Sequence, residues 1–355
     1  MMTVVKQFYH IIHSRLDEGL APMANIVEGY FRMCGSDLQS ACVQAAAAKE
    51  SAKESASDPT LVRELIELHK RCQSFVDNQF NSHPSFERAL KTAFEHVMNN
   101  DVGKLPNAEY LAAYCDRILR KGGERLSDKE VETQLANIAQ LFSYLNDKDL
   151  FSEIYRNLLS KRLLNNKSAN DDAEKSMISK LKLKCGAQFT SKMEGMRNDL
   201  QQGKDHIAKF AEFDKSTYNI GDIDFNVQVL TTGFWPSNVE TKLELPPVMN
   251  SCVEAFTDYY NKSTEARKLN FVASLGNCTV QMKFGMKKYD LNVTTLQVSD
   301  NPVVLNIFQT LLSVSNRMAF CGGERESRFG SRARVQKCFS HVAFLSIANI
   351  LLNPE

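Results

Sequence analysis

Residue types that could perform chemistry are sparse in this sequence and mostly lie in ordinary helical contexts. His10-Ile-Ile-His13 could bring two imidazoles to one metal ion, but its segment has helical periodicity, which favours surface or core histidines. Asp171-Asp172 could be paired catalytic carboxylates, but acidic residues also favour the first turn of a helix because they complement its dipole. No GxxxxGKS/T, GxSxG or HExxH motif occurs. We therefore expect no catalytic residue, no metal site and no cofactor.

Three other features could recognise a partner. Lys161-Arg162 follows an apolar helical stripe, and further cations nearby could complete a basic surface or belong to solvated helix faces: Arg156, Lys167, Lys175, Lys180, Lys182 and Lys184. Trp235, the only tryptophan, follows a strand pattern and could be core, a structural turn or an interface anchor. The basic stretch 317–337 could touch nucleic acid, but we interpret it as a disordered basic linker.

Bulk composition gives no support for a nucleic-acid or membrane partner. The 355 residues carry a formal net charge of +1, with 43% hydrophobic and 24% charged residues. The nine cysteines include no CxxC pair, and the first residues do not resemble a signal peptide, so we expect the cytoplasm and nucleus. Two apolar runs, Val303–Val314 and Val342–Leu352, are shorter than the ~20 residues that span a bilayer and are candidate buried helices.

Helical periodicity runs through the first two thirds of the chain. Asp58-Pro59 suits an N-cap and a first-turn proline, and the apolar residues behind it repeat at helical spacing as far as Phe80. Ser127 and Glu130 have the spacing of a capping box, in which each side chain satisfies a backbone donor of the other residue. Further amphipathic stripes start near Pro84, Leu111, Asp147, Ser168 and Phe189. Such consecutive helices favour a bundle.

The hydrophobic period changes from about 3.6 to about 2 near Asp224. Apolar and polar residues then alternate over 225–229, 278–284 and 289–293, as is typical of half-buried strands. The segment Gly285–Lys288 predicts a hairpin, and Pro246-Pro247 opens an intervening helix. We therefore predict an α+β fold that is mainly helical, in which residues 1–222 are nearly all helical and a small antiparallel sheet lies only within 223–298.

Several long segments together resemble the cullin family. LFSYLNDKDLFSEIYRNLLSKRLL (141–164) and SANDDAEKSMISKLKLKCGAQFTSKMEGMRNDL (168–200) are similar to its signature helices, and FNVQVLTTGFWP (225–236) is similar to the strand and turn that follow. Shorter similarities keep the family's order at 115–123, 243–249, 266–271 and 275–278. The resemblance covers roughly residues 5–298 and suggests the cullin-one-like branch.

The resemblance implies a partial cullin. A full cullin has three N-terminal helical repeats, the first of which binds the substrate adaptor, and this sequence is similar from the third repeat onwards. The lysine motif that accepts a ubiquitin-like modifier in the C-terminal winged helix has no counterpart here, and the pattern departs from the family after Gln297. We expect a last-repeat-like helical domain at 1–115, a four-helix bundle at 116–222, an α/β subdomain at 223–298 and a divergent tail at 299–355.

For function, the resemblance implies a non-catalytic scaffold of a cullin–RING E3 ubiquitin ligase of the SCF type, acting in ubiquitin-dependent protein catabolism. Its α/β subdomain would accept a strand of a RING-box protein, which assigns to that contact Phe225, Val227, Val229, Thr231 and Trp235. Lys161 and Arg162 would lie on a basic surface that receives the acidic tail of the ubiquitin-conjugating enzyme. A cullin-associated exchange factor is a further expected partner. A truncated, regulatory cullin-like protein without ligase output remains the alternative.

Overall fold

The computed structural model describes most of the helical part of the chain and the four strands of one sheet. The described residues are 7, 9, 20–47, 59–101, 105–213, 217–218, 220, 223–236, 245, 247–264, 267–284, 287–295 and 344–354. The chain divides into two compact units, Met1–Glu194 and Gly195–Glu355, with the boundary inside one helix. The division predicted from the sequence, with boundaries at 115, 222 and 298, stays a prediction.

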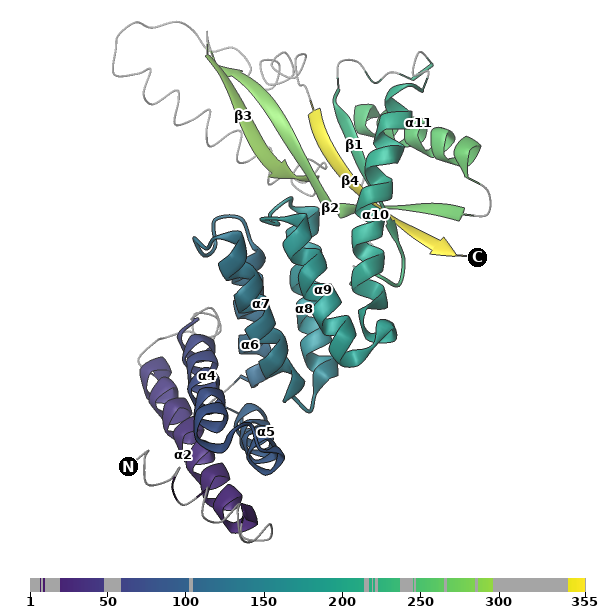
Figure 1. Ribbon diagram of the computed structural model, residues 1–355. Coiled ribbons are helices and arrows are strands. Elements are labelled where there is room, and N and C mark those ends of the chain that lie inside the picture. Colours follow the sequence, from purple (N-terminus) through teal and green to yellow (C-terminus); the bar gives the residue numbers. More distant parts are fainter. Residues whose placement is uncertain are drawn as a thin grey trace, which may run out of the picture. The chain divides into compact units, whose positions relative to one another are not determined.

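The first unit is built of consecutive helices (Figure 1). They are α2 (Leu20–Ala47), α4 (Thr60–Phe80), α5 (Pro84–Met98), α6 (Asn107–Leu119), α7 (Asp128–Ser143), α8 (Lys148–Leu164), α9 (Asp171–Cys185) and the first turns of α10 (Ala187–Ala211). The predicted capping box is confirmed, because the Ser127 hydroxyl accepts from the Glu130 amide and the Glu130 carboxylate accepts from the Ser127 amide. Asp147 caps α8 as predicted, whereas Asn170 caps α9. Pro59 is the N-cap of α4, and Asp58 lies outside the described residues.

The helices of the first unit are held by buried apolar faces and by close backbone approach. Phe80 and Phe86 stack with their ring centroids 3.7 Å apart, and both are fully buried. A Cβ at Gly35 of α2 would lie 2.3 Å from a methyl group of Val97 in α5, so this crossing requires glycine. Gln39 adds a buried hydrogen bond from its Nε2 to the Val97 carbonyl oxygen at 2.8 Å.

The second unit contains a four-stranded sheet, and one helix lies between the first two strands in the chain. Its strands are β1 (Phe225–Thr231), β2 (Arg267–Phe284), β3 (Lys287–Thr294) and β4 (Phe344–Pro354), and α11 (Pro247–Ser263) lies between β1 and β2 in the chain. The spatial order is β1-β4-β2-β3. The β2–β3 and β2–β4 pairings are antiparallel, and the β1–β4 pairing is parallel. The predicted hairpin is confirmed, because Phe284 pairs with Lys287.

The fold class predicted from the sequence is confirmed, but two expectations about the sheet's extent are wrong. The described residues contain no strand before Phe225, as expected, yet β4 lies beyond residue 298. The apolar run Val342–Leu352, taken as a candidate buried helix, contributes β4 instead. A continuous apolar run suits a buried strand as well as a buried helix, and here pairing on both edges selects the strand. The other run, Val303–Val314, lies outside the described residues, as do residues 317–337 and both His10 and His13.

Candidate partner-docking site

One face of β1 is buried in the core of the second unit. Val227 is 1% exposed and Val229 is 5% exposed. They pack in one cluster with Phe210 of α10 and with Phe256 and Tyr260 of α11. A partner therefore cannot reach these two valine side chains without opening the core. The partly buried Phe225 packs against the same cluster.

The opposite face of β1 presents polar side chains. Successive side chains of a strand point to opposite faces, so Asn226 and Gln228 face away from Val227 and Val229. Their amide oxygens have little solvent exposure and accept no hydrogen bond from the described part of the chain. Buried acceptors normally find a donor, so this face suits a neighbour that brings one. Sequence reasoning noted the alternation but assigned the docking role to the apolar residues.

The end of β1 is fixed by a carboxylate that sequence reasoning missed. Asp199 of α10 is 7% exposed and accepts hydrogen bonds from the Thr231 amide at 2.7 Å and the Thr231 hydroxyl at 2.9 Å. It also accepts from the indole Nε1 of Trp235 at 2.8 Å. Trp235 is itself only 5% exposed. The structure therefore places Thr231 and Trp235 in an internal clamp that orients β1, with their polar groups directed at Asp199.

The turn after β1 depends on two glycines. Gly233 has φ +97°, a conformation that side chains with a Cβ rarely adopt. A Cβ on Gly195 of α10 would lie 2.5 Å from the Phe234 ring, so the ring can sit on the helix only over a glycine. Together with Asp199, these contacts hold the TTGFWP segment against α10.

Arg162 is the largest correction to the predicted site. Its side chain is 1% exposed, and its Nε and Nη2 donate to the two carboxylate oxygens of Glu174, both at 2.9 Å. Its Nη1 donates to Asp116 of α6. Its assignment to a basic surface is therefore wrong, because the guanidinium joins α6, α8 and α9 inside the first unit. Tyr155 packs beneath it, with the guanidinium carbon 5.5 Å from the ring centroid.

Burial and pairing act in opposite directions on the charge of Arg162. Burial disfavours the guanidinium, but the hydrogen bonds and charge of Glu174, with Tyr155 and Asp116, outweigh it and raise the pKa of Arg162. Burial is the largest cause of the strongly raised pKa of the Tyr155 hydroxyl, and the nearby charge of Glu174 raises it further. Arg162 therefore stays charged and Tyr155 stays neutral.

The other predicted cations form a weaker patch than the sequence implies. Lys161 and Lys167 are exposed and form no ion pair among the described residues. Lys175 pairs with Asp171 and Asp172, Lys180 with Glu132 and Lys182 with Glu194. Lys161 at the end of α8 and Lys167 just beyond it thus carry exposed charge that no acidic group among the described residues offsets.

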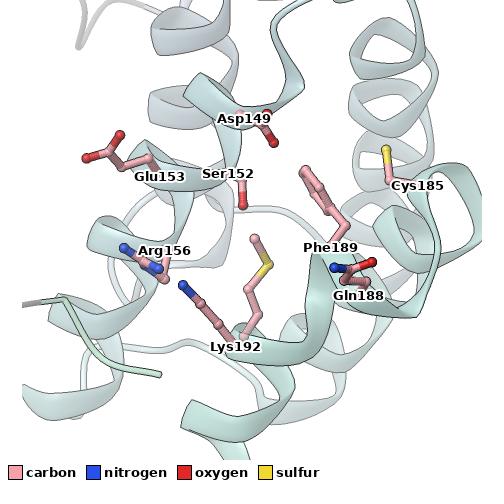
Figure 2. A pocket seen from close by; sticks show the side chains of 9 residues that line it. Asp149, Ser152, Glu153, Arg156, Cys185, Gln188, Phe189 and Lys192 are labelled. Atoms are coloured by element: carbon pink, nitrogen blue, oxygen red, sulfur yellow. The ribbon is translucent and has the colours of Figure 1, made fainter. Parts of the chain in front are cut away.

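A hollow of about 480 Å³ lies in the first unit, between α8 and the junction of α9 and α10 (Figure 2). It is lined by Asp149, Ser152, Glu153, Arg156, Cys185, Gln188, Phe189, Lys192 and Met193. Two acids and two bases offset each other there, which favours no single charged ligand. Burial raises the pKa of the Cys185 thiol, so the nucleophilic thiolate is disfavoured. The hollow therefore lacks the features of a covalent active site.

The described ranges contain neither a metal-ligand cluster nor a membrane-spanning helix. No group of three or more His, Cys, Asp or Glu side chains there is arranged to hold a metal ion. None of the helices in that part of the chain is long and apolar enough to cross a bilayer.

Comparisons with known proteins agree with the resemblance in the sequence. A family model described as the cullin alpha solenoid domain matches residues 2–206, and one described as the cullin alpha+beta domain matches residues 229–317. The chain is 44% identical to Cullin-1 of Oryza sativa subsp. japonica over 294 residues, which cover 81% of this chain and 39% of that protein. It is 40% identical to Cullin-2 of Arabidopsis thaliana over 304 residues, which cover 84% and 41%.

A more distant relative extends the comparison. The chain is 33% identical to Cullin-3 of Dictyostelium discoideum over 304 residues, which cover 86% of this chain and 37% of that protein. The chain thus spans about two fifths of the length of these relatives. The residues matched by the two family models include Asp199, Thr231 and Trp235, the end of β1 from Val229 onwards, and the helix that carries Lys161 and Arg162.

Proposed function

The chain belongs to the cullin family, and on that basis we propose that it is a non-catalytic scaffold segment of a cullin–RING ubiquitin ligase. In this proposal the sheet of the second unit docks a RING-box protein, and the first unit helps to position the ubiquitin-conjugating enzyme. The chemistry belongs to those partners.

The observation that carries the proposal is the way β1 is presented. The apolar side chains of β1 are buried and Asp199 fixes its end, so β1 offers a partner chiefly its backbone groups. Main-chain pairing with a rigid strand is the requirement for β-augmentation, in which an extended segment of a partner joins a sheet. This supports docking by strand addition rather than by insertion of side chains into a pocket.

Proline substitutions test this docking mode. Successive N–H groups of a strand point to opposite edges, so Val227→Pro with Val229→Pro removes donors from one edge of β1, and Asn226→Pro with Gln228→Pro removes them from the other. We expect one of these double variants to bind a RING-box protein at least about tenfold more weakly, which corresponds to ~1.4 kcal/mol. Alanine at the same positions keeps the N–H groups and is the matched control.

The readout needs a check on folding that is independent of binding. Trp235 is the only tryptophan, so its fluorescence reports whether the clamp at the end of β1 is intact. If both proline variants keep the wild-type emission and bind the RING-box protein as the wild type does, β1 is not part of the docking sheet and the proposal fails.

Of the two residues predicted to contact the conjugating enzyme, we propose only Lys161, because the side chain of Arg162 is buried. An exposed lysine attracts an acidic tail mainly by accelerating encounter. We also propose that the chain acts in the cytoplasm and nucleus. This proposal rests on the family to which the chain belongs.

A further inference from the structure

The central position of the sheet is filled by a segment from far along the chain. β4 lies between β1 and β2, in register with Phe225–Thr231 on one side and with two parts of β2 on the other. It follows β3 in the chain only after residues 295–343, and it lies beyond the residues matched by either family model. The strand that completes the sheet is therefore separate, in sequence, from the part of the chain that the cullin alpha+beta model matches.

β4 is the sole strand neighbour of β1 among the described residues. If β4 left, the facing edges of β1 and β2 would be about 9–10 Å apart, which is two strand spacings. A gap of that width accepts one extended segment that can hydrogen-bond along both of its edges. Main-chain pairing on two edges does not depend on which chain supplies the segment.

The ladder that holds β4 to β2 is interrupted. Pairing runs from Arg267↔Pro354 to Val272↔Asn349, breaks, and resumes from Asn277↔Ile347 to Val280↔Phe344. The β2–β3 ladder, in contrast, is continuous from Asn277↔Thr294 to Phe284↔Lys287. On its β1 side β4 has an uninterrupted ladder, from Phe225↔Ser346 to Thr231↔Leu352, so the break on the β2 side is where β4 is held less continuously than β3 is.

We infer that the position between β1 and β2 is the docking slot of this sheet, and that β4 occupies it in competition with a strand of the RING-box protein. The inference rests on the proposed function. The chain would then hold its own docking site closed until the partner strand displaces β4. The apparent dissociation constant of the partner would exceed the intrinsic one by the inverse of the fraction of molecules whose slot is open.

A reversible covalent lock tests this inference in the full chain. Ser346 of β4 lies directly opposite Cys278 of β2, a native buried cysteine. Directly opposed residues of antiparallel strands have Cα atoms about 4.5–5.5 Å apart, within the range that a disulfide bridges. In a buffer that contains glutathione disulfide, the two thiols of a Ser346→Cys variant would be oxidised to a disulfide. The two electrons and two protons would reduce one glutathione disulfide to two glutathione thiols, and an added thiol reductant would reverse the reaction. Ser346→Ala, treated identically, is the matched control.

The lock has a separate readout for each claim. We expect peptide mapping to find the crosslink to Cys278 in the oxidised variant. We expect that variant to bind the RING-box protein at least about tenfold more weakly than after reduction, whereas Ser346→Ala binds equally in both states. Absence of the crosslink would show that β4 does not sit opposite Cys278, and would overturn the inference.

Binding results separate the inference from the proposed function. If the locked chain binds the RING-box protein as well as the reduced chain, the partner uses another edge and the inference is wrong, while the proposed function stands. If neither state binds it, the proposed function is wrong, and the competition fails with it.

An opening variant provides the opposite perturbation. β4 is hydrogen-bonded to β1 on one side and to β2 on the other. Ile347→Pro with Ile350→Pro therefore removes two backbone N–H donors of β4 that pair with one or the other of these strands. This double variant should bind the RING-box protein at least about tenfold more tightly than the wild type, and Ile347→Val with Ile350→Val should not. Weaker binding by a proline variant with wild-type Trp235 emission would mean that β4 is part of the docking surface, and would also overturn the inference.

Discussion

Arg162 and Glu174 form a fully buried, two-pronged ion pair, with Nε–Oε1 and Nη2–Oε2 distances of 2.9 Å. Arg162 also reaches Asp116, and Ser168 donates to Glu174 at 2.6 Å, so the charges are compensated by hydrogen bonds from several elements. The pair joins three helices of the first unit, which are the helices that must stay rigid if the unit is to position other proteins.

Removing Arg162 should destabilise the first unit strongly. Arg162→Met leaves Glu174 as a buried carboxylate without a cation, while Asp116 keeps its ion pair with Arg120; loss of a buried charge partner typically costs about 3–5 kcal/mol. Lys161→Met, one residue earlier and exposed, should change the free energy of unfolding by less than about 0.5 kcal/mol. Urea titration followed by circular dichroism compares the two. Equal unfolding midpoints would contradict the structural role of Arg162.

The Asp199 clamp should control both stability and tryptophan emission. Asp199→Ala leaves the Thr231 amide, the Thr231 hydroxyl and the Trp235 indole without their acceptor. Each lost hydrogen bond to a charged group is worth about 1.5–3 kcal/mol, although the three are not additive. We expect a red-shifted emission of Trp235 and a lower unfolding midpoint, with Asp199→Asn intermediate because it keeps one acceptor oxygen. Wild-type emission in Asp199→Ala would show that the clamp is not formed.

His69 should make the first unit sensitive to acid. Burial lowers the pKa of His69 to about 4 from the ordinary 6.5, and its Nε2 is 2.9 Å from the Tyr144 hydroxyl. The unfolded chain therefore binds a proton that the folded chain rejects between those two values, so stability should fall as pH drops from about 6.5 towards 4. The loss attributable to His69 is on the order of 3 kcal/mol.

The measurement is the free energy of unfolding across this pH window for the wild type and for His69→Gln. The difference between the two proteins isolates His69 from other titrating groups. It should be largest near neutral pH and should shrink towards pH 4. A difference that stays constant with pH would mean that His69 titrates normally in the folded state.

Lys161 should affect recruitment of the conjugating enzyme through its charge alone. Lys161→Glu should slow association with an enzyme that has an acidic tail, and the effect should shrink as salt rises, because the Debye length is ~8 Å at physiological ionic strength. Lys175→Glu is the matched control, since Lys175 already pairs with Asp171 and Asp172. Association at the wild-type rate in low salt would leave Lys161 as a solvated helix residue.

Local patterns in the sequence predicted the local structure well. The Ser127–Glu130 spacing predicted the capping box, and the change of period near Asp224 predicted the start of β1 at Phe225, because both signals involve only neighbouring residues. These patterns also place the predicted docking residues on one strand and its following turn.

Features that depend on distant partners could not be predicted in this way. Arg162 follows Lys161 at a helix end and has the sequence context of a surface cation, but its partners Glu174 and Asp116 are 12 and 46 residues away in the chain. Asp199 likewise meets Thr231 and Trp235 across 32 and 36 residues. β4 was missed because its apolar run has no period that separates a buried strand from a buried helix.

Hydrogen–deuterium exchange of the full chain with and without a RING-box protein tests the central claim most directly. If the partner adds a strand to this sheet in the place of β4, amides of β1 (Phe225–Thr231) and β2 (Arg267–Phe284) should exchange no faster in the complex than in the free chain, while those of β4 (Phe344–Pro354) should lose protection. The helices of the first unit provide the internal reference. A stable complex in which protection changes elsewhere, and all four strands exchange as in the free chain, would contradict docking through the sheet.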